Sequence, residues 1–256
     1  MKTIILGAGN IATHLSLALQ NAGFEISQIY NRSEKSAQQL AGMLQTRYTA
    51  DISQVDSDAS LYIICVSDDA IKPVAEKLPV TDGLVVHTAG SVPMDVLSGK
   101  YPNYGVFYPL QTFSKSRAVD FSEISLFLEA NTIENLQKLR QIARKVSKKV
   151  YNATSDERIQ LHLAAVFGCN FVNCLYDIAA RIAGKAGFDF EILTPLITEV
   201  ARKVAASGNP RNEQTGPAVR NDVKVMQKHL ELLSDTPDWQ NIYARLSECI
   251  ISSRPL

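Results

Sequence analysis

The chain has 256 residues, of which 46% are hydrophobic, and its 26 Lys and Arg residues balance its 26 Asp and Glu residues. A chain of this length can form two domains that each bury a core. Its zero formal net charge argues against nucleic acid as the main partner and against a role at a membrane surface.

The first predicted strand, Thr3 to Leu6, runs directly into the turn Gly7-Ala8-Gly9 and a helix with apolar residues at helical spacing. The pattern G-x-G-x-x-A gives a tight turn at Gly7, room for a diphosphate at Gly9 and close helix–strand packing at Ala12. Backbone amides at the start of such a helix bind phosphate. We therefore predict that a dinucleotide binds at Gly7, Gly9, Asn10, Ile11 and Ala12.

The second predicted strand, Ile26 to Tyr30, ends at Asn31-Arg32-Ser33. An NAD site usually has an Asp or Glu here, which holds the ribose 2′-hydroxyl. Arg32 offers donors suited to a 2′-phosphate, and Ser33 can assist while it starts the next helix. The pattern favours NADP, bound by Asn31, Arg32 and Ser33. The alternative is an arginine of a solvated loop.

Strand and helix patterns alternate up to about Tyr151, which predicts a doubly wound, mostly parallel sheet of the Rossmann type (α/β). We expect an NADP-binding Rossmann domain over residues 1–152. After the second strand, further strands are predicted at 46–50, 61–66, 84–87, 104–108, 124–129 and near Val150, with helices at 33–44, 70–78 and 132–146.

Strand signals vanish after Thr154, so residues 153–256 are predicted to form an all-helical domain. Its first helix, 156–183, is apolar around its whole circumference in the middle and needs burial on all sides. We expect it to pack against the Rossmann domain and a second subunit, as a homodimer through the helical domain. Further helices are expected at 189–206, interrupted by Pro195, at 222–233 and at 237–252.

Four cysteines without a C-x-x-C pair indicate reduced thiols and give no zinc pattern, so we expect no metal. The N-terminus lacks the apolar core of a signal peptide, and we find no run of eighteen apolar residues for a membrane span. These features predict a cytoplasmic protein without a membrane partner.

A family resemblance is carried by the glycine turn, by Asn31-Arg32-Ser33 and by three further stretches: His87-Thr88-Ala89-Gly90-Ser91, Tyr108-Pro109-Leu110-Gln111-Thr112-Phe113 and Thr215-Gly216-Pro217-Ala218-Val219-Arg220-Asn221-Asp222. Over essentially its whole length the chain resembles an uncharacterised bacterial family of Rossmann-like NADP oxidoreductases with a helical C-terminal domain of unknown function. That family lies within the pyrroline-carboxylate reductase and 6-phosphogluconate dehydrogenase superfamily. The resemblance implies a 6-phosphogluconate dehydrogenase C-terminal-like domain and a nicotinamide-dependent reduction in the cleft between the domains.

In open α/β sheets the ligand lies beyond the carboxyl ends of the strands, and here these ends carry polar residues. Hydride transfer needs a positioned acceptor and a donor that stabilises the developing charge. The candidates at these ends are Val66, Ser67 and Asp68 for the cofactor and Ser91, Thr88 and Gln111 for chemistry or substrate positioning. Thr88 and Ser91 alternatively cap the next helix.

On the long helix, His162, Asn170 and Asn173 fall with positions 166 and 169 close to one α-helical face. If this stripe faces the nicotinamide, His162 acts as general acid and Asn170 orients the substrate. The alternative is a hydrogen-bonded histidine with asparagines at an interface. Hydroxyacid dehydrogenases of the resembling superfamily place a lysine on this helix, whereas none occurs here between Asp156 and Gly184. That leaves His162, a bound water, or an imine substrate that arrives protonated, as in pyrroline-carboxylate reductase.

A third candidate group is Thr215-Gly216-Pro217 with Arg220 and Asp222. Gly-Pro predicts a turn and a helix start, with Asp222 in the first turn of the helix. Thr215 and Arg220 can bind a carboxylate or phosphate of the substrate. A pair between Arg220 and Asp222 across the dimer is equally compatible with the sequence.

Together these features predict an NADP-dependent oxidoreductase that transfers a hydride between the nicotinamide and a small carbonyl or imine metabolite. The predicted catalytic residues are His162, Ser91 and Asn170, and the predicted substrate-binding residues are Gln111, Thr215 and Arg220. The main alternative is a non-catalytic NADP(H)-binding redox sensor or scaffold protein. The sequence has no nucleophile elbow, phosphate loop or zinc helix that would indicate a competing chemistry.

Overall fold

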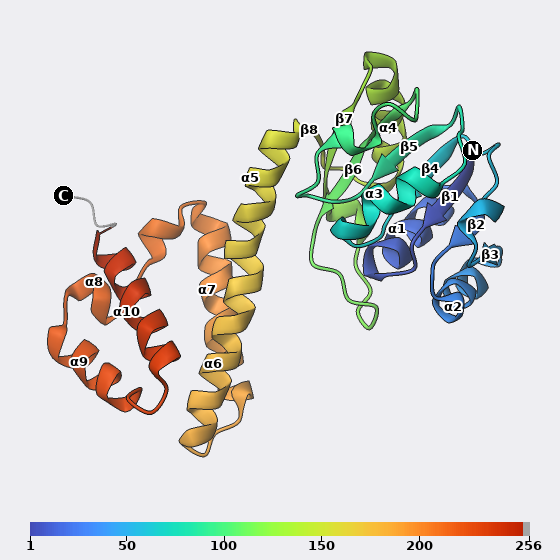
Figure 1. Cartoon of the computed structure of the whole chain (residues 1–256). Coiled ribbons are helices and arrows are strands. Elements are labelled where there is room, and N and C mark those ends of the chain that lie inside the picture. The colour runs from blue at the N-terminus through green and yellow to red at the C-terminus, as the bar shows by residue number, and fades with distance from the viewer. Residues whose placement is uncertain (253–256) are drawn as a thin grey trace. The chain divides into compact units, whose positions relative to one another are not determined.

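The structure, a computed structural model, describes residues 1–252 and contains two compact units (Figure 1). The N-terminal unit is Met1–Asn170, and the C-terminal unit begins at Phe171. The division falls inside a continuous helix, Ser155–Lys185, so no loop marks it. The predicted domain boundary after residue 152 stays a prediction.

One eight-stranded sheet forms the centre of the N-terminal unit (Figure 1). Its strand order is β3-β2-β1-β4-β5-β6-β7-β8, and every neighbouring pair is parallel except β6 with β7. This arrangement confirms the predicted doubly wound, mostly parallel sheet. The strands are β1 (Lys2–Leu6), β2 (Glu25–Tyr30), β3 (Arg47–Thr49), β4 (Leu61–Ile64), β5 (Leu84–His87), β6 (Tyr104–Leu110), β7 (Ser125–Ala130) and β8 (Val150–Asn152).

Two hydrophobic cores lie on opposite faces of this sheet. Ile5 belongs to the first core, whereas its neighbours Ile4 and Leu6 belong to the second, because successive side chains of a strand point to opposite faces. The first core is covered by helices α1 (Asn10–Asn21), α2 (Glu34–Leu44) and α4 (Ile133–Val146), and the second by α3 (Asp68–Lys77). Burial on both faces explains why these strands are continuous apolar runs.

The long helix consists of α5 (Ser155–Ala165), a π-helical turn (Val166–Phe171) and α6 (Val172–Lys185). The predicted stripe from His162 to Asn173 assumes a regular α-helix, and this assumption is wrong after Val166, because a π turn holds more residues per turn. Among the described residues, this helix is long and apolar enough to cross a membrane by length and composition alone, although the core helix of a soluble protein passes the same test.

The C-terminal unit is helical, as predicted. Pro195 lies in the first turn of its helix and does not interrupt it, since the first turn needs no proline N–H donor. Asp222 is the N-cap of the following long helix, where its side chain accepts the Val225 N–H at 3.2 Å, so it lies one position before the predicted first turn. The helices after α6 are α7 (Thr194–Ser207), α8 (Pro217–Arg220), α9 (Val223–Leu232) and α10 (Pro237–Ser252).

Candidate functional site

The turn between β1 and α1 requires glycine at its first position. Gly7 has φ +127°, and a Cβ there would lie 2.3 Å from the backbone oxygen of Cys65 at the end of β4. Around Gly9, the N-cap of α1, a Cβ would meet nothing within 4 Å. The turn is therefore tight on the side of the sheet and open on the other side.

The N–H groups at the start of α1 have no side-chain hydrogen-bond partner. No side chain caps α1 and no acidic residue lies in its first turn, whereas Ser33, Thr132 and Thr154 cap the helices α2, α4 and α5. Helix α3 also lacks a side-chain cap, but Asp68 and Asp69 occupy its first turn. Of these helix starts, α1 is therefore the one suited to an anion.

A cavity of about 600 Å³ joins this turn to the ends of β2 and β4. Six of the predicted cofactor residues line it. One of them is Arg32, an exposed residue just after the end of β2. The cavity also contains Lys77, which sequence analysis did not select. The residues that line it are Gly7, Ala8, Gly9, Tyr30, Asn31, Arg32, Ile52, Cys65, Val66, Ser67, Asp69, Ala70, Pro73, Val74 and Lys77.

The other predicted cofactor residues have different contacts. Ile11 and Ala12 pack in the first core, which is the close helix–strand packing expected at Ala12. Asn10 donates to the carbonyl of Phe113 at 2.8 Å, and Ser33 accepts the Ser36 N–H at 3.5 Å as the cap of α2. Asp68 accepts a hydrogen bond from Ser91. Contacts of these five residues with a cofactor stay predictions.

A second polar cluster lies at the carboxyl ends of β4, β5 and β6. Besides the bond between Ser91 and Asp68, the Tyr108 hydroxyl and Nδ1 of His162 share a hydrogen bond of 3.2 Å. Gly90 packs between them, because a Cβ there would lie 2.8 Å from the Tyr108 oxygen and 2.9 Å from Nδ1 of His162. Asp68 belongs to the segment Ser67–Asp69 that borders the cavity, so the cluster continues the cofactor site along the same sheet edge.

Burial keeps the Tyr108 phenol protonated. Burial raises the pKa of Tyr108 to about 12. The positive charge of Arg158 lowers this pKa, and the negative charge of Asp68 raises it further. The phenol can therefore donate to Nδ1 of His162, in which case the ring carries its proton on Nε2. Nε2–H of His162 can then donate a hydrogen bond to a ligand. The two side chains of this pair lie 54 positions apart in the sequence.

Arg158 ties α5 to the loop after β5. Its side chain is 1% exposed, and it donates to the carbonyls of Ala89 (3.1 Å) and Val92 and to Glu129 (2.6 Å). His162 follows one turn later on α5, so the same anchor fixes the helix that carries His162 and the loop that carries Gly90 and Ser91. We regard Arg158 as a positioning residue.

Thr88 and Ser91 do not cap a helix, because Thr88 donates to the carbonyl of Ile64 (3.4 Å) and Ser91 donates to Asp68. Gln111 is exposed after β6 and accepts the Thr112 N–H at 2.8 Å. Asn170 is exposed in the π turn. Thr215 and Arg220 lie in the C-terminal unit and are exposed. Their roles stay predictions.

Tyr108, Arg158, Glu129 and Lys77 were not predicted from the sequence. For Tyr108 a signal was present, since it lies near the end of β6 in the stretch from which Gln111 was selected. No local pattern marks Arg158 as buried, because its partners come from two distant segments.

Residues 2–89 match the family described as NADP oxidoreductase, coenzyme F420-dependent, and residues 124–250 match a domain of unknown function, DUF2520. The chain is similar to the crystal structure of "putative NADP oxidoreductase BF3122" from Bacteroides fragilis, with 45% identity over 98% of both chains and a TM-score of 0.91. No curated protein sequence matches it significantly.

Two more distant structures share the fold. Protein TM1727 from Thermotoga maritima is 22% identical, with 97% of this chain and 96% of that chain covered and a TM-score of 0.74. A 1-pyrroline-5-carboxylate reductase from Streptococcus pyogenes is 15% identical over 98% of both chains, with a TM-score of 0.65.

Proposed function

The chain belongs to the family that joins a Rossmann domain of the NADP oxidoreductase, coenzyme F420-dependent type to the DUF2520 domain, and on this premise we propose that it is an NADP-dependent oxidoreductase. Its substrate would be a small carbonyl or imine metabolite. The observation that carries the proposal is the cavity that joins the glycine turn to Arg32, with no acidic residue among Asn31, Arg32 and Ser33.

The residues present fit a dinucleotide phosphate. The uncapped start of α1 can bind the diphosphate, because its N–H groups have no side-chain partner. Arg32 can form two parallel hydrogen bonds to a 2′-phosphate, and Lys77 adds a second cation to the lining of the same cavity. These features support NADP over NAD.

When bound, the reduced cofactor supplies a hydride to the substrate. The chain's own contribution is a proton, which we assign to Nε2 of His162 in its imidazolium form, with its Nδ1–H donating to the Tyr108 oxygen. Ser91, oriented by Asp68, can hold the oxygen or nitrogen atom at which charge develops. For Asn170 we propose substrate orientation, and for Gln111, Thr215 and Arg220 we propose substrate binding.

An imine is the better candidate of the two acceptor classes. The long helix carries no lysine between Asp156 and Gly184 that could act as a strong proton donor. An imine nitrogen is far more basic than a ketone oxygen, so it accepts the His162 proton more readily before the hydride arrives. The fold shared with a pyrroline-carboxylate reductase is consistent with this choice.

The experiment is a screen for NADPH oxidation with cyclic imines, ketones and keto acids. We expect turnover with at least one compound, about a hundredfold loss of kcat in His162→Asn and about tenfold in Tyr108→Phe, with NADPH affinity unchanged in both. Tyr48→Phe, at an exposed tyrosine of β3, is the matched control. Tight NADPH binding without turnover of any compound would support the redox-sensor alternative.

We also propose that the protein is a cytoplasmic homodimer that pairs through its helical unit. The large apolar side chains that this unit exposes support the pairing, among them Ile192, Leu196 and Val200. A second copy of the chain presents the same surface, which is the usual geometry of a symmetric dimer.

A further inference from the structure

The connection between β6 and β7 lies against the start of α1. We call residues 111–122 the strap. Asn10 donates to the carbonyl of Phe113 at 2.8 Å, and Nε2 of His14 is 2.9 Å from the carbonyl of Ser114. The His14 ring also stacks on the Phe113 ring with centroids 5.4 Å apart. Two side chains from the first turns of α1 therefore fix the backbone of the strap beside the glycine turn.

Lys115 of the strap reaches the glycine turn itself. Its Nζ donates to the backbone oxygen of Ala8 at 2.9 Å, and Ala8 stands between Gly7 and Gly9 in the lining of the cofactor cavity. An ammonium group has three N–H donors, and the contact with Ala8 uses one of them. Lys115 can therefore bind a second acceptor beside the turn.

The position of this ammonium group needs an electrostatic explanation. The start of a helix carries partial positive charge, and a cation there is unfavourable unless an anion lies nearby. The first turn of α1 contains no acidic residue, and Lys115 forms no ion pair among the described residues. A bound diphosphate would supply the missing negative charge.

We propose that Lys115 is a further cofactor-binding residue, which holds the diphosphate of the dinucleotide from the strap, opposite the backbone amides of α1. This inference rests on the proposed function, since it needs a dinucleotide in the cavity. Arg32 would bind the 2′-phosphate and Lys115 the diphosphate. Because NADPH and NADH both carry the diphosphate, Lys115 would contribute to the binding of both.

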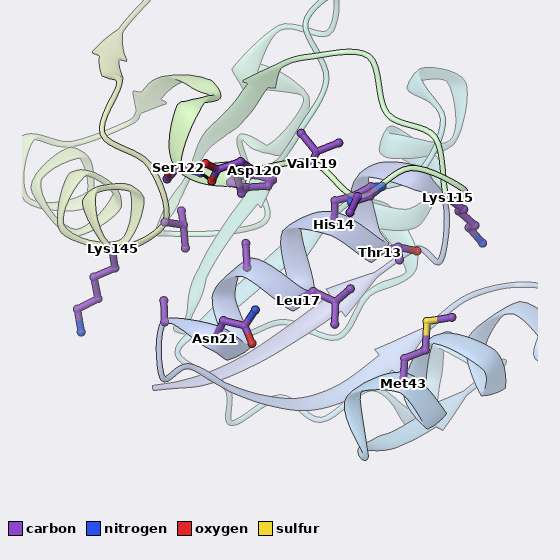
Figure 2. A pocket seen from close by; sticks show the side chains of 15 residues that line it. Thr13, His14, Leu17, Asn21, Met43, Lys115, Val119, Asp120, Ser122 and Lys145 are labelled. Atoms are coloured by element: carbon purple, nitrogen blue, oxygen red, sulfur yellow. Dashed lines mark hydrogen bonds between the residues drawn. The ribbon is translucent and has the colours of Figure 1, made fainter.

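A control variant comes from the pocket between the strap, α1 and α4, which has a volume of about 640 Å³. Figure 2 shows Lys115 and Lys145 at opposite ends of this pocket in the view drawn. Lys145 belongs to α4, and its Nζ lies 5.3 Å from the centre of the Phe24 ring. Lys145→Met removes the same charge from the same pocket at a residue that has no contact with the glycine turn.

The test is a calorimetric titration of the full chain and its Lys115→Met, Lys115→Arg and Lys145→Met variants. The probes are NADPH, NADH and adenosine 2′-monophosphate, which keeps the 2′-phosphate but has no phosphate at the 5′ position. We expect Lys115→Met to raise the Kd about tenfold or more for both dinucleotides, as for the loss of a charge-assisted hydrogen bond. The Kd for the monophosphate should be unchanged, and Lys115→Arg and Lys145→Met should bind as the wild type does.

Three other outcomes would overturn the inference, and they differ in whether the proposed function survives. Unchanged dinucleotide binding by Lys115→Met would show that Lys115 only ties down the strap, while the proposed function stands. An equal loss for the monophosphate would mean that the variant loosens the whole site. Wild-type protein that binds neither dinucleotide would remove the proposed function as well.

Discussion

The two units of the chain differ in how they bury their apolar residues. The N-terminal unit has two cores, one on each face of its sheet, whereas Ala218 is the one buried residue among those described after Asn170. Large side chains such as Leu196 (62% exposed) and Val200 (53% exposed) face outward in the C-terminal unit. Both units come from one chain of ordinary composition.

Apolar content alone therefore does not let a unit bury its own apolar side chains. A doubly wound sheet closes its own cores, because helices from the same segment cover both faces. The helices of the C-terminal unit bring apolar residues to outer faces, which in water need another protein surface. The N-terminal unit should therefore respond to damage at single buried residues, and the C-terminal unit to damage at its exposed apolar faces.

The largest effect is expected for Arg158→Met. Removing this buried guanidinium leaves Glu129 and the carbonyls of Ala89 and Val92 without their partner, which should cost about 3 kcal/mol of the free energy of unfolding. Urea unfolding followed by circular dichroism measures this loss. The fluorescence of Trp239, the only tryptophan, reports on the C-terminal unit and should change little.

The control for this prediction is Arg245→Met in the C-terminal unit. Arg245 pairs with Glu248, but its side chain is 83% exposed, so we expect a loss below about 0.5 kcal/mol. Equal losses in the two variants would show that the N-terminal network is no more than a surface ion pair.

The second effect concerns the exposed face of α7. Leu196→Asp places a charge where we expect a second copy of the chain, so it should convert dimers into monomers at micromolar concentration. Light scattering after gel filtration measures the mass. Val80→Asp, at a residue of the N-terminal unit that is 66% exposed, is the control and should leave the mass unchanged. Wild-type protein that is monomeric at high concentration would contradict the proposed dimer.

The smallest effect is a pH dependence inside the N-terminal unit. Burial, helped by the charge of Arg158, lowers the pKa of His87 from 6.5 to about 3. As the pH falls below 6.5, His87 becomes protonated in the unfolded chain but stays neutral in the folded chain. The free energy of unfolding therefore decreases as the pH falls. Between pH 6.5 and pH 5 the loss is about 1.5 kcal/mol.

The variant His87→Asn removes this titration and should have a flatter stability profile between pH 6.5 and pH 5. Urea midpoints measured across this range give the comparison. A slope in the variant as steep as in the wild type would assign the acid sensitivity to other groups.

Most of the fold could be predicted because its signals are local. The glycine turn is one, because a strand before it and a helix after it mark the turn at Gly7 in the sequence. The same holds for the cap at Ser33. Pro195 was misplaced because a proline in the first turn of a helix and a proline that breaks a helix differ only in where the helix begins.

The candidate site could be predicted only where one segment supplies it. Arg32 follows its strand directly, whereas the pair of Tyr108 and His162 forms only when β6 and α5 meet. Lys115 bonds to a turn 107 positions earlier in the chain. The π turn after Val166 has no local signal that we recognise, so the predicted polar stripe failed there.

The proposed function requires that the cavity between the glycine turn and Arg32 binds NADP. The most direct test is a titration of wild-type protein and Arg32→Ala with NADPH and NADH side by side. We expect the wild type to prefer NADPH at least tenfold, and the variant to lose this preference while it keeps its affinity for NADH. Wild-type protein that binds neither cofactor, or a variant that loses both equally, would contradict this expectation.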